Sequence, residues 1–216
     1  MDEPRYNESY IKAKEQQAAS HTPPKSSESH ERLPPGQTET KAFPIFDLGI
    51  RPSLDRYPRW TLEIKGNIDH LATLSIEEVR KLASTDITAD FHCVTRWTRF
   101  DLNWSGVPFK KIMELAKPRP SVKFVVFHSF DKYTTNVALD DVRRDKVIVA
   151  TKLENNEIPP EHGGPIRMIL PHLYGWKSAK FLTAIEFVDK DEPGFWETRG
   201  YSNRARPWIE ERYSDD

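Results

Sequence analysis

The chain has 216 residues, of which 37% are hydrophobic and 30% are charged, and its formal net charge is -1. This length allows one domain with a sizeable core plus a tail, and the balanced charge excludes a chain-wide positive field for nucleic acid. The single cysteine excludes an internal disulfide, a four-cysteine zinc site and a four-cysteine iron–sulfur cluster.

Residues 1–40 differ in texture from the rest of the chain. They are rich in Glu, Lys, Ser, His and Pro, and their apolar residues follow neither a helical nor a strand period. Such a segment buries too little apolar surface to offset its ordering entropy. We therefore predict a disordered or extended tail over residues 1–40, in which residues 10–19 can form a short helix, and a folded domain over residues 41–216.

The sequence carries no recognisable membrane or secretion signal. No run approaches the roughly 20 apolar residues of a transmembrane helix, and residues 1–17 lack a secretory apolar core. A chain that relies on no disulfide also suits a reducing compartment. We expect no membrane span and a cytoplasmic location.

The folded part begins with alternating apolar residues at positions 60–64, which predict a strand that ends at the turn signal Gly66-Asn67. A capping-box pattern at residues 75–78, followed by apolar residues at helical spacing, predicts a helix over residues 76–83. Residues 87–93 alternate again, and this pattern places Cys93 at the end of a strand.

The second half of the chain contains more strands than helices. Pro108 can occupy a first helical turn, with Phe109, Ile112 and Leu115 on one helix face. Apolar runs predict further strands, at residues 122–129, 147–152, 166–170 and 181–188. We therefore expect an α+β fold with mixed β-sheets and short helices.

Cys93 lies in the stretch Phe-His-Cys-Val-Thr-Arg-Trp at residues 91–97. A lone cysteine is most often a small buried hydrophobe, but His92, Arg96 and Arg99 place potential positive charge near this one. Positive charge favours the thiolate, which is both the nucleophilic and the metal-binding form. The spacing alone leaves nucleophile and metal ligand open.

Two later stretches have the composition of ligand-binding loops. Residues 162–167 read His-Gly-Gly-Pro-Ile-Arg, in which two glycines permit close backbone approach to a ligand, although Gly-Gly-Pro also suits an ordinary turn. Residues 174–180 read Tyr-Gly-Trp-Lys-Ser-Ala-Lys. They can surround a phosphate with backbone donors and lysines, or form a solvated loop.

The order of these three stretches resembles the molybdopterin-binding domain of the sulfite oxidase family. The lead-in at residues 33–37 and 43–44, and the end at residues 194–197, 200–201 and 207–208, are similar to those of small bacterial sulfite oxidase-like oxidoreductases. The resemblance covers residues 33–213. It implies the sulfite oxidase-type molybdopterin-binding fold and a molybdenum–molybdopterin cofactor, with tungsten as the alternative metal.

Site residues follow from the resemblance position by position. Cys93 would be the metal ligand. The residues that would contact the cofactor are Asp47, His128, His162, Arg167, Gly175, Trp176, Lys177, Ser178 and Lys180.

The activity that the resemblance implies is oxygen-atom transfer on a small oxyanion or sulfur compound, in which the cofactor supplies the chemistry. A guanidinium binds oxyanions bidentately, so Arg96 or Arg99 could act beside Cys93 by holding such a substrate, and Trp97 could form a wall of its pocket. Because no second redox centre is recognisable, electrons would pass to or from a separate electron-transfer protein.

Two other functions stay open at this stage. Cys93 could be the nucleophile of a hydrolase or transferase with His92 or His128 as the base, although adjacent side chains on a strand point apart, which weakens the case for His92. The other alternative is a non-catalytic domain that binds an anion, or a partner through residues 1–40. Cys93 would be dispensable in such a domain.

Overall fold

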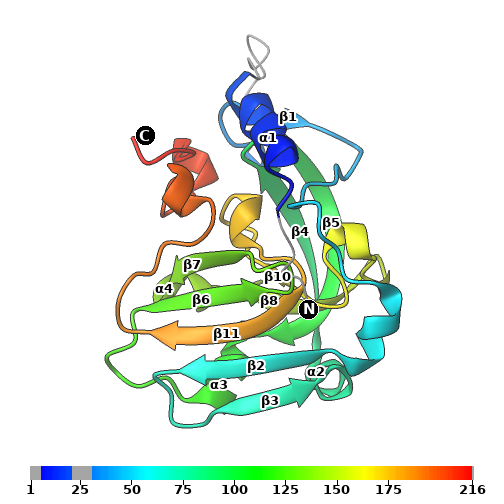
Figure 1. Cartoon of the computed structure of the whole chain (residues 1–216), viewed down its shortest axis with the longest axis vertical. Helices are drawn as coiled ribbons and strands as arrows, with labels where there is room; N and C mark the ends of the chain where they lie inside the picture. The colour runs from blue at the N-terminus through cyan, green and yellow to red at the C-terminus, as the bar shows by residue number, and fades with distance from the viewer. Residues whose placement is uncertain (1–5, 21–30, 216) are drawn as a thin grey trace.

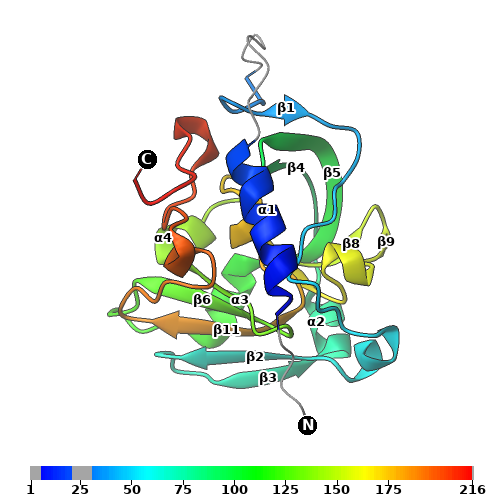
Figure 2. The same cartoon turned by 45° about the horizontal axis from the view of Figure 1, so that its top comes forward.

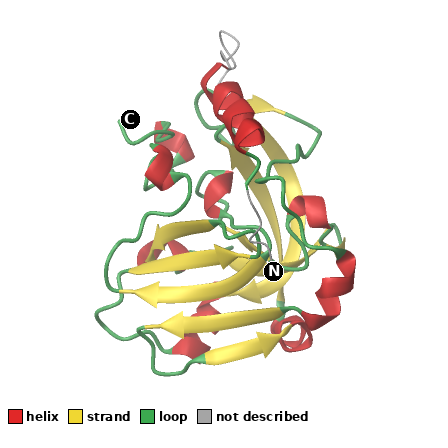
Figure 3. Cartoon of the chain, viewed as in Figure 1, coloured by secondary structure: helices red, strands yellow, loops and turns green. Residues whose placement is uncertain are grey.

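Residues 6–20 and 31–215 are described by the structure, a computed structural model, and they form two β-sheets with short helices (Figures 1 and 3). One sheet has five strands in the order β3 (Ala72–Ser75), β2 (Thr61–Gly66), β11 (Leu182–Val188), β6 (Phe124–Ser129) and β7 (Thr134–Ala138). Strands β2 and β11 are parallel, and the other neighbours are antiparallel.

The second sheet has six strands and is built around a long hairpin. Its strands are β1 (Thr38–Glu39), β4 (Thr85–Cys93), β5 (Trp97–Pro108), β8 (Ile148–Leu153), β9 (Asn156–Glu157) and β10 (Arg167–Ile169). The hairpin of β4 and β5 rises away from the five-stranded sheet (Figure 1). Parallel and antiparallel pairs occur in both sheets, which confirms the predicted α+β fold with mixed sheets.

The helices are short and lie between or beside the sheets. They are α1 (Glu8–Ser20), α2 (Ile76–Leu82), α3 (Phe109–Ala116) and α4 (Leu139–Val142), with 3-10 turns η1 (Leu54–Arg59), η2 (Pro160–His162), η3 (Gly175–Lys177), η4 (Glu197–Arg199) and η5 (Pro207–Ile209). Helix α2 begins in the predicted capping box, where Ser75 and Glu78 each accept a hydrogen bond from the other's backbone N–H.

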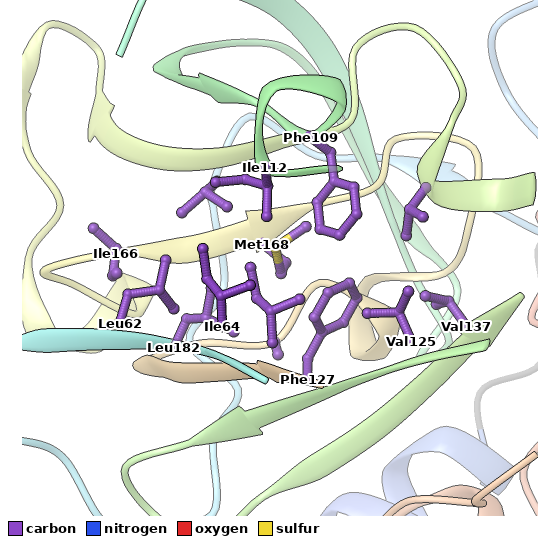
Figure 4. Close-up of a cluster of buried hydrophobic side chains, with 14 of the residues drawn as sticks. Leu62, Ile64, Phe109, Ile112, Val125, Phe127, Val137, Ile166, Met168 and Leu182 are labelled. Carbon is purple, nitrogen blue, oxygen red and sulfur yellow. The ribbon is translucent and has the colours of Figure 1, made fainter. Parts of the chain in front are cut away.

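The main core lies between the five-stranded sheet and α3. In Figure 4, Phe109 and Ile112 of α3 point toward Leu62 of β2 and Phe127 of β6. Ala116 completes the buried stripe of α3, whereas Leu115 is 39% exposed. The predicted helix is confirmed, but Ala116 rather than Leu115 shares the buried face with Phe109 and Ile112, because the buried side chains follow i, i+3 and i+7 spacing.

The N-terminal tail contributes one helix to the described structure. Helix α1 corresponds to the helix predicted at residues 10–19, inside a segment that we expected to be disordered or extended overall. Its Ile11 is 2% exposed and packs into the main core, a tertiary contact that the sequence pattern does not reveal. Residues 1–5 and 21–30 lie outside the described residues. Within residues 6–20 and 31–215, no helix is long and apolar enough to cross a bilayer.

Candidate functional site

A pocket opens where the end of β4, the turn after β6, the start of β10 and the turn η3 meet. The space between its walls, counted out to the surrounding solvent, is about 940 Å³. The aromatic side chains that line it are Phe43, Phe46, Phe91, Trp97, Tyr133, Trp176, Trp196 and Tyr201. Aromatic faces at these positions suit a flat ring system.

Cys93 is the last residue of β4 and its side chain lines this pocket. The residue is 8% exposed, and its Sγ lies 3.2 Å from the Thr95 hydroxyl. The Cys93 carbonyl accepts hydrogen bonds from the Gln37 side chain and from the Arg96 backbone N–H, each at 3.1 Å. These contacts close the turn between β4 and β5, and they fix the sulfur in the pocket wall.

The turn η3 packs against the end of β4. A parallel bridge joins Tyr174 to His92, and a Cβ placed on Gly175 would overlap the Phe91 ring. Only glycine therefore allows the turn to approach β4 this closely. The Trp176 ring stacks on Tyr174, with 5.4 Å between the ring centroids, and the Trp176 carbonyl accepts a 2.6 Å hydrogen bond from the Tyr133 hydroxyl.

Arg167 brings a buried positive charge to the pocket wall. Its side chain is fully enclosed at 1% exposure, and it donates to the carbonyls of His162 at 2.7 Å and Ser178 at 3.0 Å. In the described part of the chain, no carboxylate lies within ion-pair distance of this guanidinium. Burial accordingly lowers the pKa of Arg167 to about 9.

Lys180 adds a second cation to the same wall. Its ammonium donates to the Glu161 carbonyl at 2.7 Å and, among the residues that the structure describes, has no carboxylate within 4 Å. Burial, followed by the charge of Arg167, lowers the pKa of Lys180 to about 7. Two cations that lack acidic partners form a site for an anion, because a bound anion would offset the cost of burying them.

His162 lines the pocket as a neutral ring at neutral pH. It stacks on Phe43 with 4.5 Å between ring centroids, and burial, followed by the charge of Lys180, lowers its pKa to about 4. Asp47 also lines the pocket, where its carboxylate accepts from the Gly49 N–H at 2.9 Å and from Arg51 at 2.7 Å. His162 and Asp47 are both among the predicted cofactor contacts, and the structure brings both to the pocket.

Two of the predicted cofactor contacts lie elsewhere. The Lys177 ammonium is fully buried and faces away from the pocket, 2.6 Å from Glu197 and 2.7 Å from the Asn136 carbonyl. His128 lies on β6 and its Nε2 is 2.8 Å from the Glu186 carboxylate. Neither side chain lines the pocket. Gly175, Trp176 and Ser178 do line it.

The two arginines predicted to hold a substrate also lie outside the pocket lining. Arg96 adopts a left-handed backbone conformation with φ 69° in the turn after Cys93, and its guanidinium lies 3.7 Å from Glu210 in the C-terminal segment. Arg99 lies on β5. Trp97, the residue that follows Arg96, does line the pocket as expected.

Asp131 is the pocket residue that sequence reasoning missed most completely. It is 3% exposed, and burial together with the charge of Asp47 raises its pKa to about 6. One carboxylate oxygen accepts from the Tyr133 N–H at 3.2 Å. A turn residue follows no apolar period, so the sequence carried no signal for it. The pocket residue Thr95, in the turn after β4, was missed for the same reason.

The fold and the pocket together define a cofactor-binding protein. Its pocket has one thiol, aromatic walls and two cationic side chains that can bind an anion. Residues 49–196 match the family of oxidoreductase molybdopterin binding domains. The Bacillus subtilis (strain 168) oxidoreductase YuiH is 38% identical over 192 residues, which cover 89% of this chain and 97% of that relative. The chain belongs to the oxidoreductase molybdopterin binding domain family, and the predicted membership in the sulfite oxidase family is confirmed.

More distant relatives match 64% and 63% of the chain. The protein-methionine-sulfoxide reductase catalytic subunits MsrP of Campylobacter jejuni and Xanthomonas axonopodis are 28% and 26% identical over 156 and 153 residues. This chain spans 52% and 47% of their lengths. The sulfane dehydrogenase SoxCD of Paracoccus pantotrophus has the same fold, with a TM-score of 0.59, 18% identity and coverage of 70% of this chain and 45% of that one.

The residues present in the pocket fit the cofactor that the family implies, molybdenum–molybdopterin. A thiolate is a soft ligand suited to a sulfur-rich metal site, and Cys93 supplies one. A phosphate-bearing pterin cofactor is an anion and requires cations in its pocket, which Arg167 and Lys180 provide without acidic partners among the described residues. The aromatic walls suit the flat pterin ring.

Proposed function

We propose that this chain catalyses oxygen-atom transfer on a small oxyanion or sulfur compound and exchanges electrons with a separate redox protein. The observation that carries the proposal is that Cys93, Arg167 and Lys180 line one pocket. Among the described residues, no carboxylate forms an ion pair with either of the two cationic side chains. When bound, the molybdenum–pterin group supplies two-electron oxygen-atom transfer. The remaining work of the chain is to hold, orient and enclose that group.

Each pocket residue has a proposed part in this binding. Cys93 provides the thiolate ligand to the metal. Arg167 and His162 contact the pterin, the first as a charged donor and the second as a neutral ring. Lys180 and the loop residues Gly175, Trp176 and Ser178 hold the phosphate. Asp47, which already binds Arg51, orients the neighbouring wall.

The substrate class is supported by the names of the relatives, one a methionine sulfoxide reductase and another a sulfane dehydrogenase. Oxidation of sulfite takes one oxygen from water and releases two protons and two electrons as sulfate forms. Reduction of a sulfoxide takes up two protons and two electrons and releases water. The single cysteine cannot support a four-cysteine cluster, and the proposal assigns the exchange of the two electrons to a separate redox protein.

A cysteine hydrolase or transferase gains no support from the geometry. His92 and His128, the predicted bases, do not line the pocket that Cys93 lines. The His92 ring instead lies 2.9 Å from the Thr98 hydroxyl. Burial lowers the pKa of His92 to about 4, which is too low for an efficient base at neutral pH.

The proposal is tested by steady-state assays on protein from its native host. Sulfite oxidation would be followed with an artificial electron acceptor and sulfoxide reduction with a reduced viologen dye. We expect turnover in one direction, abolished by Cys93→Ser and unchanged by Arg119→Gln, a substitution in a surface ion pair with Asp69. Turnover of carboxyl esters or amides that requires Cys93, with no redox turnover, would contradict the proposal.

A further inference from the structure

Helix α1 lies along the mouth of the Cys93 pocket. In Figures 1 and 2 it runs between the β4–β5 hairpin and the C-terminal segment. Tyr6, just before the helix, packs on Phe195 with 5.1 Å between ring centroids. A Cβ placed on Gly49 would lie 3.7 Å from the Asn7 side chain, and Gly49 directly follows Leu48, which lines the pocket. The segment that leads into the helix is therefore seated beside the rim of the pocket.

Residues just before α1 and along its first two turns lie close to pocket-lining residues. The Tyr6 hydroxyl has a pKa raised by burial and by the charge of Asp131, and Tyr10 has a pKa raised by burial and by the charge of Asp47. Two turns into the helix, the charge of Glu15 adds to the burial that raises the pKa of Tyr201. A helix rises about 1.5 Å per residue, so the helical stretch from Glu8 to Glu15 spans roughly 10 Å beside the pocket.

The side chains of α1 that the structure describes bury little apolar surface against the domain. Of the α1 side chains that the structure describes, only that of Ile11 is buried. The helix has 13 residues, and a helix of that length is marginal without tertiary packing. Segments held by few buried apolar contacts open at low free-energy cost. The docked position of α1 therefore depends on Ile11 to a large degree.

We propose that α1 is the specificity element of this enzyme, which restricts the Cys93 pocket to small molecules and excludes sulfur groups carried by a folded protein. The inference rests on the proposed function, because it names the substrate class of that same site. A sulfoxide in a protein enters a pocket only if the flanking polypeptide can lie across the mouth. The docked helix fills the space that this polypeptide would need.

The proposed role of α1 is tested first on full-length, cofactor-free protein by alkylation of Cys93. Two thiol reagents are compared, iodoacetamide and a maleimide carried on a polyethylene glycol chain. Ile11→Asp places a charge in the buried contact, and Ala13→Asp, at an exposed position of the same helix, is the matched control. Ile11→Ala keeps the test available if Ile11→Asp fails to fold.

The bulky reagent should label wild-type protein and Ala13→Asp slowly, and Ile11→Asp about tenfold faster or more, because the substitution undocks α1. Iodoacetamide rates should differ little among the three proteins. Equal rates of labelling by the polyethylene glycol maleimide in wild type and in both Ile11 variants would overturn the proposed role of α1. This readout is independent of metal and turnover, so it stands even if the proposed function fails.

Holoenzyme completes the test with two substrates, free methionine sulfoxide and an oxidised protein. Wild type should reduce the free compound only, and Ile11→Asp should gain activity on the oxidised protein while its kcat/KM for the free compound is unchanged. Equal wild-type turnover of both substrates would contradict the proposed role of α1 and would leave the proposed function standing. Absence of redox turnover in every protein would contradict the proposed function instead.

Discussion

Arg167 and Lys180 lie close enough in the pocket wall that the charge of Arg167 is, after burial, the second cause lowering the pKa of Lys180 to about 7. Two like charges in one buried wall repel each other and lose hydration. In the described part of the chain neither has a carboxylate partner. An anion that binds between or beside them offsets the cost of their repulsion and lost hydration. We expect the phosphate-bearing cofactor to be that anion.

Replacement of Arg167 should weaken cofactor retention. Arg167→Met removes a charged donor worth about 1.5–3 kcal/mol, so retention of pterin should fall by roughly tenfold to a hundredfold. Arg167→Lys keeps the charge but loses the planar guanidinium. Its pterin retention should lie between that of wild type and that of Arg167→Met. Pterin content after gel filtration, read by fluorescence of the released and oxidised pterin, measures the effect.

The control for this experiment is Arg119→Met, which removes a guanidinium from an exposed pair with Asp69. Its pterin content should equal that of wild type. If Arg167→Met retained pterin as well as Arg119→Met did, the assignment of Arg167 to the cofactor would be wrong.

Lys180 should give cofactor-free protein a characteristic pH dependence of stability. Its folded pKa of about 7 lies below the ordinary lysine pKa of about 10.4. Between these values the unfolded chain binds more protons than the folded one, so stability rises with pH across this window. Below about pH 7 the full cost of the buried charge remains.

Thermal unfolding followed by circular dichroism at about pH 7, 8 and 9 measures this contribution. The melting temperature of wild type should rise relative to that of Lys180→Met over this range, by roughly 2–4 °C for each kcal/mol of cost that is relieved. Parallel curves for the two proteins would show that Lys180 is protonated in the folded state throughout the range.

Lys177 should act on stability rather than as a direct cofactor contact. Lys177→Met leaves the buried Glu197 carboxylate without its ammonium partner, which costs about 3–5 kcal/mol in such sites. Glu197 also accepts hydrogen bonds from the Thr135 hydroxyl at 2.7 Å and from the Trp176 indole N–H at 3.1 Å. Loss of the Lys177 ammonium would therefore also disturb the pocket loop that contains Trp176.

Urea unfolding of the single variants and of Lys177→Met/Glu197→Gln forms a double-mutant cycle for this pair. The double variant should be more stable than Lys177→Met. Arg143→Met, which breaks an exposed pair with Asp140, should cost less than about 1 kcal/mol. Additive costs at Lys177 and Glu197 would contradict the coupling.

Local sequence signals predicted the elements whose residues alternate or cap by themselves. The capping box of α2 and the strand that ends at Cys93 are examples. Strand β5 escaped prediction because Asp101, Asn103 and Pro108 interrupt its apolar pattern, and its pairing with β4, β8 and β1 compensates for them. Strand β7 is short and gains its burial from β6.

The family resemblance predicted which loops form the pocket, but it could not predict where each side chain points. Lys177 and Lys180 are three residues apart, yet one turns inward to Glu197 and the other lines the pocket. Glu197 comes from a separate loop, so this pairing depends on tertiary contacts. Arg96 is drawn toward Glu210 for the same reason.

The central claim is that Cys93 holds a molybdenum–pterin cofactor in this pocket. Elemental analysis for molybdenum and tungsten on protein from its native host, beside Cys93→Ser, tests it most directly. Near-stoichiometric metal in wild type and its loss in Cys93→Ser is the predicted result. Wild-type protein that contains neither metal, with activity that survives chelation and cofactor starvation, would contradict the claim.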